Sequence, residues 1–192
     1  ALSCVISNVD DCGALAKAHD ADVPAIFINS ENLSREDYDK RIAAMLDKYD
    51  VDLIVLVGYM KILSPWFVKK YPGRIINVHP SLLPKLRGAS PIRSTILEDM
   101  RTECGVSVMV LDEKMDHGPV IAQQKMEISE EAWPVAGTEL DEARSRLGGA
   151  VLADILPDWV AGTLTAEEQD HKKATYCGKL TKDMAELHID PH

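Results

Sequence analysis

The fold of this chain is constrained most by an alternation of short apolar runs with segments of helical periodicity. An apolar run, an amphipathic segment and a second apolar run form the pattern of right-handed βαβ units. The continuous apolar run 53–57 is typical of a strand buried on both faces of a parallel sheet. We therefore predict an α/β fold, with a Rossmann-like, mainly parallel sheet flanked by helices. The predicted strands are 2–6, 25–28, 53–57 and 75–79, and the predicted helices are 13–19, 34–49 and 64–71.

The second half of the chain predicts two further helices and an antiparallel hairpin late in the chain. The Ser-Pro pair at 90–91 is a typical helix start. Apolar runs at 106–110 and 120–123 flank a short acidic stretch, as expected for paired strands joined by a turn. An apolar stripe that starts at Leu140 predicts a long helix, in which Pro157 should produce a kink or a restart.

Length and composition place the chain among globular proteins with one main domain. Its 192 residues are 46% hydrophobic and 27% charged, which is enough for one substantial core. We expect a catalytic domain over residues 1–165 and a polar C-terminal extension, or the start of a linker, over residues 166–192. The apolar runs are shorter than a membrane span, and the first residues do not resemble a signal peptide. We therefore expect a cytoplasmic protein with no membrane partner.

Charge and cysteine usage disfavour several kinds of site. The four cysteines are scattered without CxxC pairing, which is typical of reduced cytosolic thiols rather than of a zinc site or a disulfide framework. Since no ligand cluster at metal spacing is visible in the sequence, we expect no metal. The net charge of −10 disfavours a broad phosphate-binding surface. The candidates for a local basic patch are Lys61, Lys85, Arg87 and Arg93.

Two polar residues stand at the end of the predicted strand 75–79. Asn77 and His79 are two residues apart, so their side chains share one face of the strand. Open α/β sheets place their chemistry at the C-terminal ends of buried strands. The amide and the imidazole therefore form a candidate site, while a strand cap and a hydrogen-bonded core histidine explain the same pattern equally well. The acidic stretch 112–119 is short enough to bring a carboxylate back to this strand end.

The motif Asn-x-His-Pro-Ser-Leu-Leu-Pro at 77–84, followed by Asp-x-Gly at 116–118, resembles the formyltransferases that use 10-formyltetrahydrofolate. The resemblance implies formyl transfer from this cosubstrate to an amine, with Asn77, His79 and Asp116 as the catalytic trio. An amide N–H and a protonated imidazole aimed at the formyl oxygen would stabilise its developing charge by roughly 3 to 4 kcal/mol per donor. Asp116 would orient His79, favour its charged form and help to move the proton of the amine through water.

The same resemblance implies a folate site. Its expected members are Met60, Lys61, Ile62 and Leu63, whose backbone would hold the pterin, together with Ser81, Leu82, Leu83 and Pro84, and with Asp112, Glu113, Lys114 and Met115 of the acidic loop. Arg35 resembles an arginine that meets the folate tail, and a solvated arginine near a helix start is the simpler explanation of it.

Two branches of the family fit different parts of the chain. Residues 5–84 resemble the enzymes that formylate glycinamide ribonucleotide, for example in Ser-Arg-Glu-Asp-Tyr-Asp at 34–39 and Gly-Tyr-Met-Lys-Ile-Leu-Ser-Pro at 58–65. Arg-Gly-Ala-Ser-Pro-Ile at 87–92 and Thr-Tyr-Cys-Gly-Lys-Leu-Thr-Lys at 175–182 resemble the catalytic domain of methionyl-tRNA formyltransferases. We therefore expect the acceptor to be the amino group of initiator methionyl-tRNA, in protein biosynthesis. Glycinamide ribonucleotide, in purine synthesis, is the alternative.

Departures from the family pattern keep further functions open. The family normally begins with one more strand–helix unit and a glycine-bearing turn, which we expect this chain to lack. The basic loop of the tRNA branch is also missing, and Leu-His-Ile-Asp at 187–190 resembles the point where that branch continues into a tRNA-binding barrel. A sugar-nucleotide N-formyltransferase, a formyl-folate hydrolase and an inactive folate-binding module would share the trio. The sequence leaves the oligomeric state undetermined.

Overall fold

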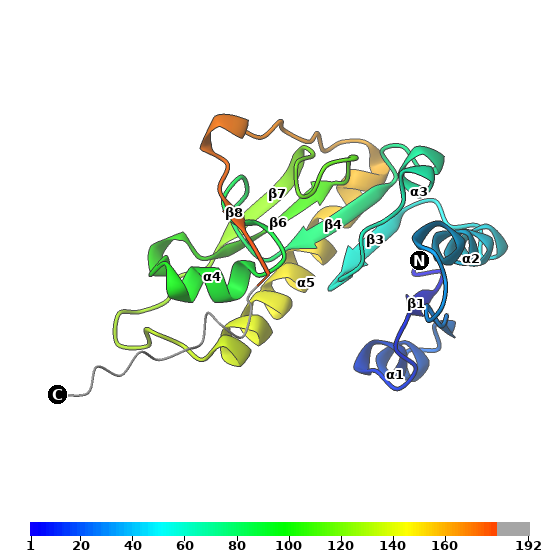
Figure 1. Ribbon diagram of the computed structural model, residues 1–192, viewed down its shortest axis with the longest axis horizontal. Helices are drawn as coiled ribbons and strands as arrows, with labels where there is room; N and C mark the ends of the chain where they lie inside the picture. Colours follow the sequence, from blue (N-terminus) through cyan, green and yellow to red (C-terminus); the bar gives the residue numbers. More distant parts are fainter. Residues whose placement is uncertain (180–192) are drawn as a thin grey trace. The chain divides into compact units, whose positions relative to one another are not determined.

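The computed structural model describes residues 1–179, which fall into two compact units (Figure 1). The stretch 187–190 and the last three residues of the stretch 175–182 lie outside the described residues. The first unit comprises Ala1–Val55 and Tyr59–Ile75, and the second comprises Leu56–Gly58 and the chain from Ile76 onward.

The first unit is built on a parallel pair of short strands, β1 (Val5–Ser7) and β2 (Ala25–Phe27). The helix between them, α1 (Gly13–Asp20), contacts both strands, which gives the predicted βαβ arrangement. Two further helices of this unit, α2 (Arg35–Lys48) and α3 (Pro65–Lys70), pack against each other.

Local capping explains where these two helices begin. The hydroxyl of Ser34 accepts a hydrogen bond from the backbone N–H of Asp37 at 3.1 Å at the start of α2. The hydroxyl of Ser64 does the same for the N–H of Phe67 at 3.2 Å at the start of α3. Pro65 occupies the first turn of α3, where its missing N–H and fixed φ cost nothing.

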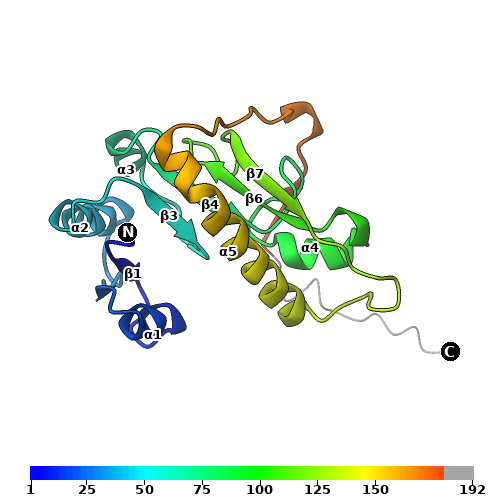
Figure 2. The same cartoon turned by 180° about the vertical axis from the view of Figure 1, so that it is seen from behind.

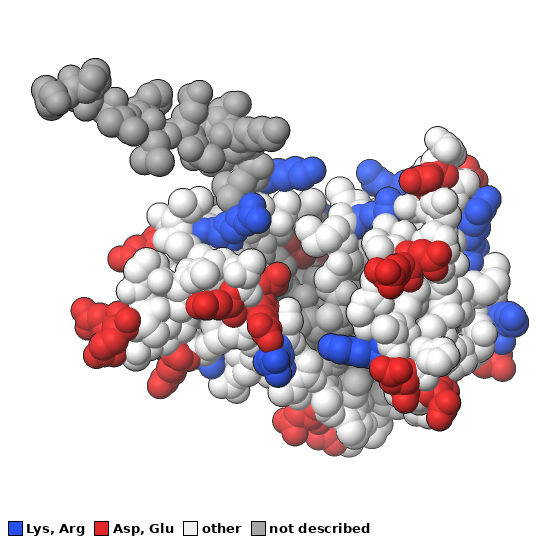
Figure 3. Space-filling view, turned by 90° about the horizontal axis from the view of Figure 1, so that it is seen from below, with Lys and Arg blue, Asp and Glu red and all other residues white. Residues whose placement is uncertain are grey.

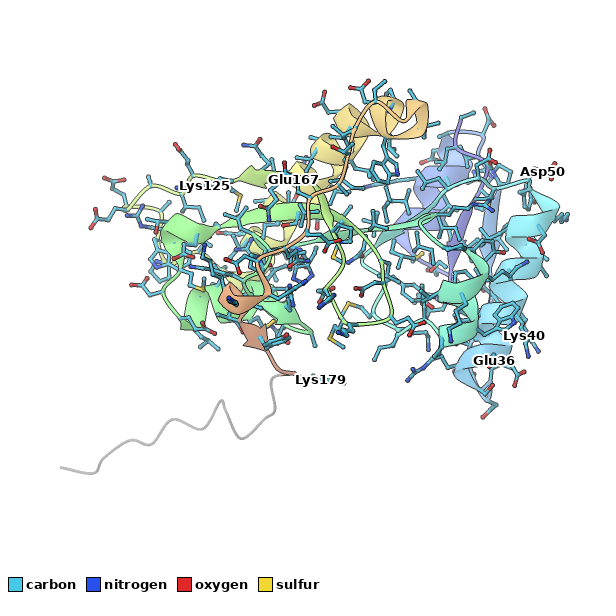
Figure 4. The ribbon with its side chains drawn as sticks, turned by 90° about the horizontal axis from the view of Figure 1, so that it is seen from above. Glu36, Lys40, Asp50, Lys125, Glu167 and Lys179 are labelled. Carbon is cyan, nitrogen blue, oxygen red and sulfur yellow. The ribbon has the colours of Figure 1, made fainter. Side chains whose placement is uncertain are left out.

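The two faces of α2 follow the predicted amphipathic pattern. Tyr38, Ile42 and Leu46 are buried on one face, at the spacing expected of a helix that covers a core. On the exposed face Lys40 pairs with Glu36 at 2.7 Å, one turn away (Figure 4).

The second unit is centred on a four-stranded sheet of order β3-β4-β6-β7. Only the last two residues of β3 (Ile54–Val57) belong to this unit. β4 (Ile75–His79) pairs antiparallel with β6 (Gly105–Val110), which pairs antiparallel with β7 (Val120–Lys125). The long helix α5 (Gly137–Ala161) packs along β6 and β7 (Figure 2).

Smaller elements complete the second unit. The helix α4 (Pro91–Leu97) packs against α5. The two-residue strands β5 (Arg87–Gly88) and β8 (Tyr176–Cys177) pair in parallel. Short 3₁₀ turns lie at Arg101–Glu103 and His171–Lys173.

Helix α5 approaches the sheet through a glycine. Leu140, Arg144 and Gly148 are its buried residues and recur every four positions. A Cβ atom at Gly148 would lie 2.7 Å from Cγ1 of Val78, so a larger residue would push the helix away from β4. The helix continues through Pro157, so the predicted restart does not occur. The missing N–H of a proline removes only one hydrogen bond of the helix, the one to the carbonyl of Ala153, and the rest of α5 is packed against the sheet.

The α/β fold class and the late antiparallel hairpin are confirmed. The first strand begins at Val5 rather than at Leu2, whose side chain is 65% exposed. The boundary between residues 165 and 166 stays a prediction. Within residues 1–179, no helix is both long and apolar enough to cross a membrane.

Candidate active site

The end of β4 carries Asn77 and His79. Ile76, just before them, is 0% exposed, and antiparallel pairing places Asn77 opposite Met109 and His79 opposite Ser107. The ring of His79 is buried, whereas Asn77 is half-buried. Among residues 1–179 the amide of Asn77 has no hydrogen-bond partner, so its donors remain available to a ligand.

The imidazole of His79 contacts two groups. Its Nε2 atom lies 2.9 Å from the carbonyl oxygen of Leu86, and its Nδ1 atom lies 3.6 Å from Oδ1 of Asp116. Because a carbonyl oxygen only accepts, Nε2 carries the proton of this hydrogen bond. Nδ1 therefore faces the carboxylate, and this side of the ring is the one that can take up or release a proton.

A tight turn fixes the carboxylate of Asp116. The φ angle of Asp116 is 50°, which is in the left-handed region that residues with side chains seldom adopt. Its Oδ2 atom accepts a hydrogen bond from the backbone N–H of Gly88 at 2.8 Å. In the same turn, a Cβ atom on Gly118 would lie 2.0 Å from the backbone oxygen of Val110, so only glycine fits there. The turn thus sets the carboxylate between Gly88 and His79.

Burial decides the protonation state of His79. The residue is 4% exposed, and the loss of surrounding water lowers the pKa of the ring below its ordinary value. Asp116 favours the charged ring, as expected, and so does the carbonyl of Leu86, while Arg144 and Arg87 disfavour it. Because burial outweighs the carboxylate, the imidazole is neutral at neutral pH.

A polar network of the buried Ser107 and the exposed Gln123 holds the loop 81–84 that follows β4. The hydroxyl of Ser107 donates to the carbonyl oxygen of Ser81 at 2.6 Å and accepts from the N–H of Leu83 at 3.0 Å. The amide of Gln123 donates to the same hydroxyl at 2.7 Å and to the carbonyl oxygen of Leu83 at 2.8 Å. The β6–β7 hairpin therefore shapes this loop, and the hydroxyl of Ser107 uses its donor and both acceptor positions.

A buried arginine ties α5 to the residues after β4. Arg144 is 1% exposed, and its Nη1 atom donates to the carbonyl oxygen of Pro80 at 2.7 Å. Its Nη2 atom donates to the hydroxyl of Thr95 on α4 at 2.9 Å. Within the described part of the chain no carboxylate pairs with this guanidinium. Its positive charge is therefore uncompensated, in keeping with its lowering effect on the pKa of His79.

The predicted folate residues fall in both units. Ser81, Leu82, Leu83, Pro84, Asp112, Glu113, Lys114 and Met115 belong to the second unit, together with Asn77, His79 and Asp116. Arg35, Met60, Lys61, Ile62 and Leu63 belong to the first unit.

Several of these residues offer exposed apolar surface. Met60 is 80% exposed and Ile62 is 55% exposed on the first unit, and Met115 is 53% exposed on the second. Leu63 is buried instead. Arg35 is exposed at the first position of α2. This exposure fits a solvated arginine and a ligand-binding arginine equally well.

Three groups at the site were missed by sequence reasoning. The carbonyl of Leu86 and the N–H of Gly88 are backbone groups, so no residue type could reveal them. The side-chain amide of Gln169 donates to the carbonyl oxygen of Asp116 at 3.0 Å. Gln169 lies in the polar stretch after α5, where no pattern distinguishes it from its neighbours.

The site residues are not accompanied by a metal-binding cluster. Among residues 1–179, no three His, Cys, Asp or Glu side chains are placed to hold a metal ion. Cys4, Cys12, Cys104 and Cys177 are free thiols.

Comparisons with known proteins agree with the resemblance seen in the motifs. Residues 1–136 match the family described as Formyl transferase. A phosphoribosylglycinamide formyltransferase of Haemophilus influenzae is 39% identical over 146 residues, which are 76% of this chain and 66% of that protein. A methionyl-tRNA formyltransferase of Listeria innocua is 38% identical over 138 residues, which are 72% of this chain and 43% of that protein. The chain therefore spans about two thirds of the first relative and less than half of the second.

A solved structure shares the fold. Glycinamide ribonucleotide transformylase 1 from Symbiobacterium toebii matches with a TM-score of 0.78 and 28% sequence identity, over 88% of this chain and 80% of that one. This similarity confirms the predicted Rossmann-like fold.

Proposed function

Because this chain belongs to the formyl transferase family, we propose that it transfers a formyl group from 10-formyltetrahydrofolate to an amine. The observation that carries the proposal is the approach of His79 and Asp116 to 3.6 Å, with the free amide of Asn77 two residues before the histidine on the same strand. These are the side chains that the reaction needs, at the end of a buried strand.

Two groups are suited to stabilise negative charge on the formyl oxygen. The amide of Asn77 supplies hydrogen-bond donors that no described residue occupies. The Nε2–H of His79 donates to the backbone carbonyl of Leu86, and a formyl oxygen that displaced this carbonyl would receive the same hydrogen bond. A neutral imidazole is sufficient for this role because it still donates through Nε2.

The proton balance of the reaction suits a carboxylate beside a histidine. The attacking amine loses one proton and the departing folate nitrogen gains one, so no net proton is consumed. The side chain of Asp116 is 12% exposed, which allows it to accept the proton of the amine through a water molecule. The Nδ1 atom of His79 carries no proton in the neutral ring, and it faces the same carboxyl group. It can therefore accept a hydrogen bond from Asp116 once that carboxyl group has taken up the proton.

For the acceptor we propose methionyl-tRNA. The two stretches that resemble the tRNA branch of the family contribute β5 and β8, and Arg87 pairs with Tyr176 and Gly88 with Cys177 in parallel register. The N–H of Gly88 also holds the carboxylate of Asp116. The features that resemble this branch thus adjoin the candidate catalytic residues.

Glycinamide ribonucleotide is the second candidate acceptor. Two comparisons support it. The chain spans 66% of the Haemophilus influenzae relative but 43% of the Listeria innocua relative, and it matches the Symbiobacterium toebii structure. On the face seen in Figure 3, Lys and Arg side chains are interspersed with Asp and Glu. A net charge of −10 distributed in this way suits a small acceptor better than a long nucleic acid.

The purified chain would be incubated with 10-formyltetrahydrofolate and with each acceptor separately, and the formylated acceptor would be detected by mass spectrometry. We expect formylation of methionyl-tRNA, and we expect the Asp116→Asn variant to form far less product. Formylation of glycinamide ribonucleotide alone would overturn the proposed acceptor and retain the proposed reaction. Release of formate without any acceptor would identify a hydrolase instead. Folate binding without either product would overturn the proposed enzymatic function.

A further inference from the structure

Arg87 is a buried arginine that hydrogen-bonds to Gln169, His171 and Tyr176, none of which is a carboxylate. It is 1% exposed, and its Nε and Nη2 atoms donate to Oε1 of Gln169 at 3.2 and 2.6 Å. Nη2 also lies 3.0 Å from Nδ1 of His171. Among residues 1–179 no carboxylate pairs with Arg87. A guanidinium buried without a counter-ion is costly, so these contacts need an explanation other than stability alone.

Gln169 connects this guanidinium to the turn that carries the candidate catalytic carboxylate. Its Nε2 atom donates to the carbonyl oxygens of Asp116 at 3.0 Å and of Gly118 at 2.7 Å. Because a guanidinium only donates, Oε1 must face Arg87, and the NH₂ group must then face the two carbonyls. Arg87 therefore fixes the orientation of the amide of Gln169, and Gln169 fixes the backbone of the turn.

Further contacts anchor the same part of the chain, residues 167–177, which we call the strap. At its start, Glu167, labelled in Figure 4, exchanges two backbone hydrogen bonds of 2.8 Å with Val120 at the start of β7. In its middle, the ring of His171 stacks on the ring of His117, with centroids 3.9 Å apart. At its end, the strap forms β8 beside β5.

Asp116 is consequently held at both ends. Gln169 binds its backbone carbonyl, and Gly88 of β5 binds its carboxylate. The strap contacts both of these groups, since it supplies Gln169 and pairs with β5. We propose that the strap, through Gln169 and Arg87, positions the carboxylate of Asp116 against His79. This proposal rests on the proposed formyl transfer and makes Gln169 and Arg87 positioning residues rather than catalytic ones.

The first test replaces Gln169 by Leu in the full chain, which removes the acceptor for Arg87 and both donors to the turn. A displacement of about 1 Å at a reacting group can cost about 100-fold in rate, so we expect kcat to fall about 10- to 100-fold. The KM values for both substrates should stay within about 2-fold, because no substrate contact is removed. The matched control is Gln124→Leu on β7, whose exposed amide donates only to the carbonyl of Lys125, and which should keep wild-type kinetics.

Two NMR measurements test the positioning without any turnover. In Gln169→Leu, the amide proton of Gly88 should move upfield, because its hydrogen bond to the carboxylate of Asp116 is weakened. The ring of His79 should titrate at lower pH than in the wild type. The nearby carboxylate partly opposes the lowering of the pKa by burial, and this opposition weakens when the carboxylate is displaced. Gln124→Leu should change neither signal. These readouts remain valid if the chain formylates no acceptor, so the two proposals can fail separately.

A second variant covers the case in which Gln169→Leu does not fold. Gln169→Glu keeps an oxygen for Arg87 and gives it a counter-ion, but it loses both donors to the turn. We expect this variant to fold, to show the displaced Gly88 amide resonance and to lose the same 10- to 100-fold in kcat, roughly as estimated above. A Gly88 resonance and a kcat that both stay at wild-type values in a folded variant at position 169 would overturn the proposal.

Discussion

The Nδ1 atom of His79 lies 3.6 Å from Oδ1 of Asp116, although the first residue ends β4 and the second stands in the turn between β6 and β7. Antiparallel pairing sets Val110, the last residue of β6, opposite Ile76 near the start of β4. The turn after β6 therefore folds back along β4 to bring Asp116 to His79. At this distance a proton can pass between the two side chains directly or through one water molecule. We therefore treat them as one acid–base unit, with Asn77 as a separate hydrogen-bond donor.

The paired arrangement predicts how substitutions combine. His79→Ala and Asp116→Asn should each lower kcat at least about 100-fold, which is the scale of a positioned acid–base group. Because the two side chains act as a unit, the double variant should be little slower than the slower single variant. Single-turnover kinetics would check both statements, with the exposed Asp154→Asn on α5 as the control. Near-normal rates in either single variant would refute the assigned roles.

The buried imidazole predicts a dependence of stability on pH. The pKa of His79 is lowered in the folded chain from its ordinary value of 6.5, so the unfolded chain binds more protons as the pH falls below that value. The free energy of unfolding should therefore decrease with falling pH, by up to about 1.4 kcal/mol per pH unit from this group. Above 6.5 the contribution is constant.

Urea unfolding on both sides of that pH would measure this effect. His79→Asn should show a flatter pH dependence than the wild type, since it removes the group responsible. His19→Asn, at an exposed position on α1, should retain the wild-type dependence. Equal slopes for His79→Asn and the wild type would show that burial of this ring does not control the effect.

Two adjacent glycines in α5 predict opposite effects of the same substitution. A Cβ atom at Gly148 would meet Val78 at 2.7 Å, whereas a Cβ atom at Gly149 would have no atom within 4 Å. Gly149→Ala should therefore stabilise the chain by about 1 kcal/mol through helix propensity. Gly148→Ala should destabilise it by about 1 to 3 kcal/mol because the helix must move from the sheet. Thermal unfolding of both variants would check this, and equal shifts would contradict the close packing of α5 on β4.

Two aspartates of α2 differ in the burial of their carboxylates and in the groups that these carboxylates bind. Asp39 is 0% exposed, and its Oδ2 atom accepts from the backbone N–H of Ser64 at 2.6 Å. Asp47 is 61% exposed and pairs with Lys70 at the surface. Asp39→Ala should cost about 1 to 3 kcal/mol because it leaves a buried N–H unsatisfied, while Asp47→Ala should cost at most about 1 kcal/mol. Urea unfolding would separate the two, and similar losses would contradict this distinction.

The parts of the fold that could be predicted from the sequence are those decided by local chemistry. Ser34 and Ser64 cap the helices that follow them. Each hydroxyl accepts a hydrogen bond from the N–H three residues later, and this contact needs no residue from elsewhere in the chain. The β-branched run before Asn77 and His79 forms a buried strand for a similarly local reason. The antiparallel hairpin followed from two apolar runs and a short turn between them.

The remaining features depend on contacts between distant residues. Arg144 is buried because it meets Pro80 and Thr95, and a single arginine on a helix gives no sign of such partners. Gln169 binds a turn far behind it in the chain, and its polar surroundings predicted only an irregular extension. The roles assigned to Asn77, His79 and Asp116, and to the folate residues, stay predictions until binding and kinetics are measured.

The strap is the part of the candidate active site that is attached least firmly to the second unit. Its backbone is joined to the rest of the unit at Glu167, at Thr175 and along the two-residue strand β8. Its side-chain contacts include those of Gln169 and His171, while the sheet and α5 carry the core. Detachment of so short an element requires less free energy than global unfolding. A molecule with its strap detached would retain its circular dichroism spectrum and its resistance to heat, and yet it would be counted among the inactive fraction of an enzyme preparation.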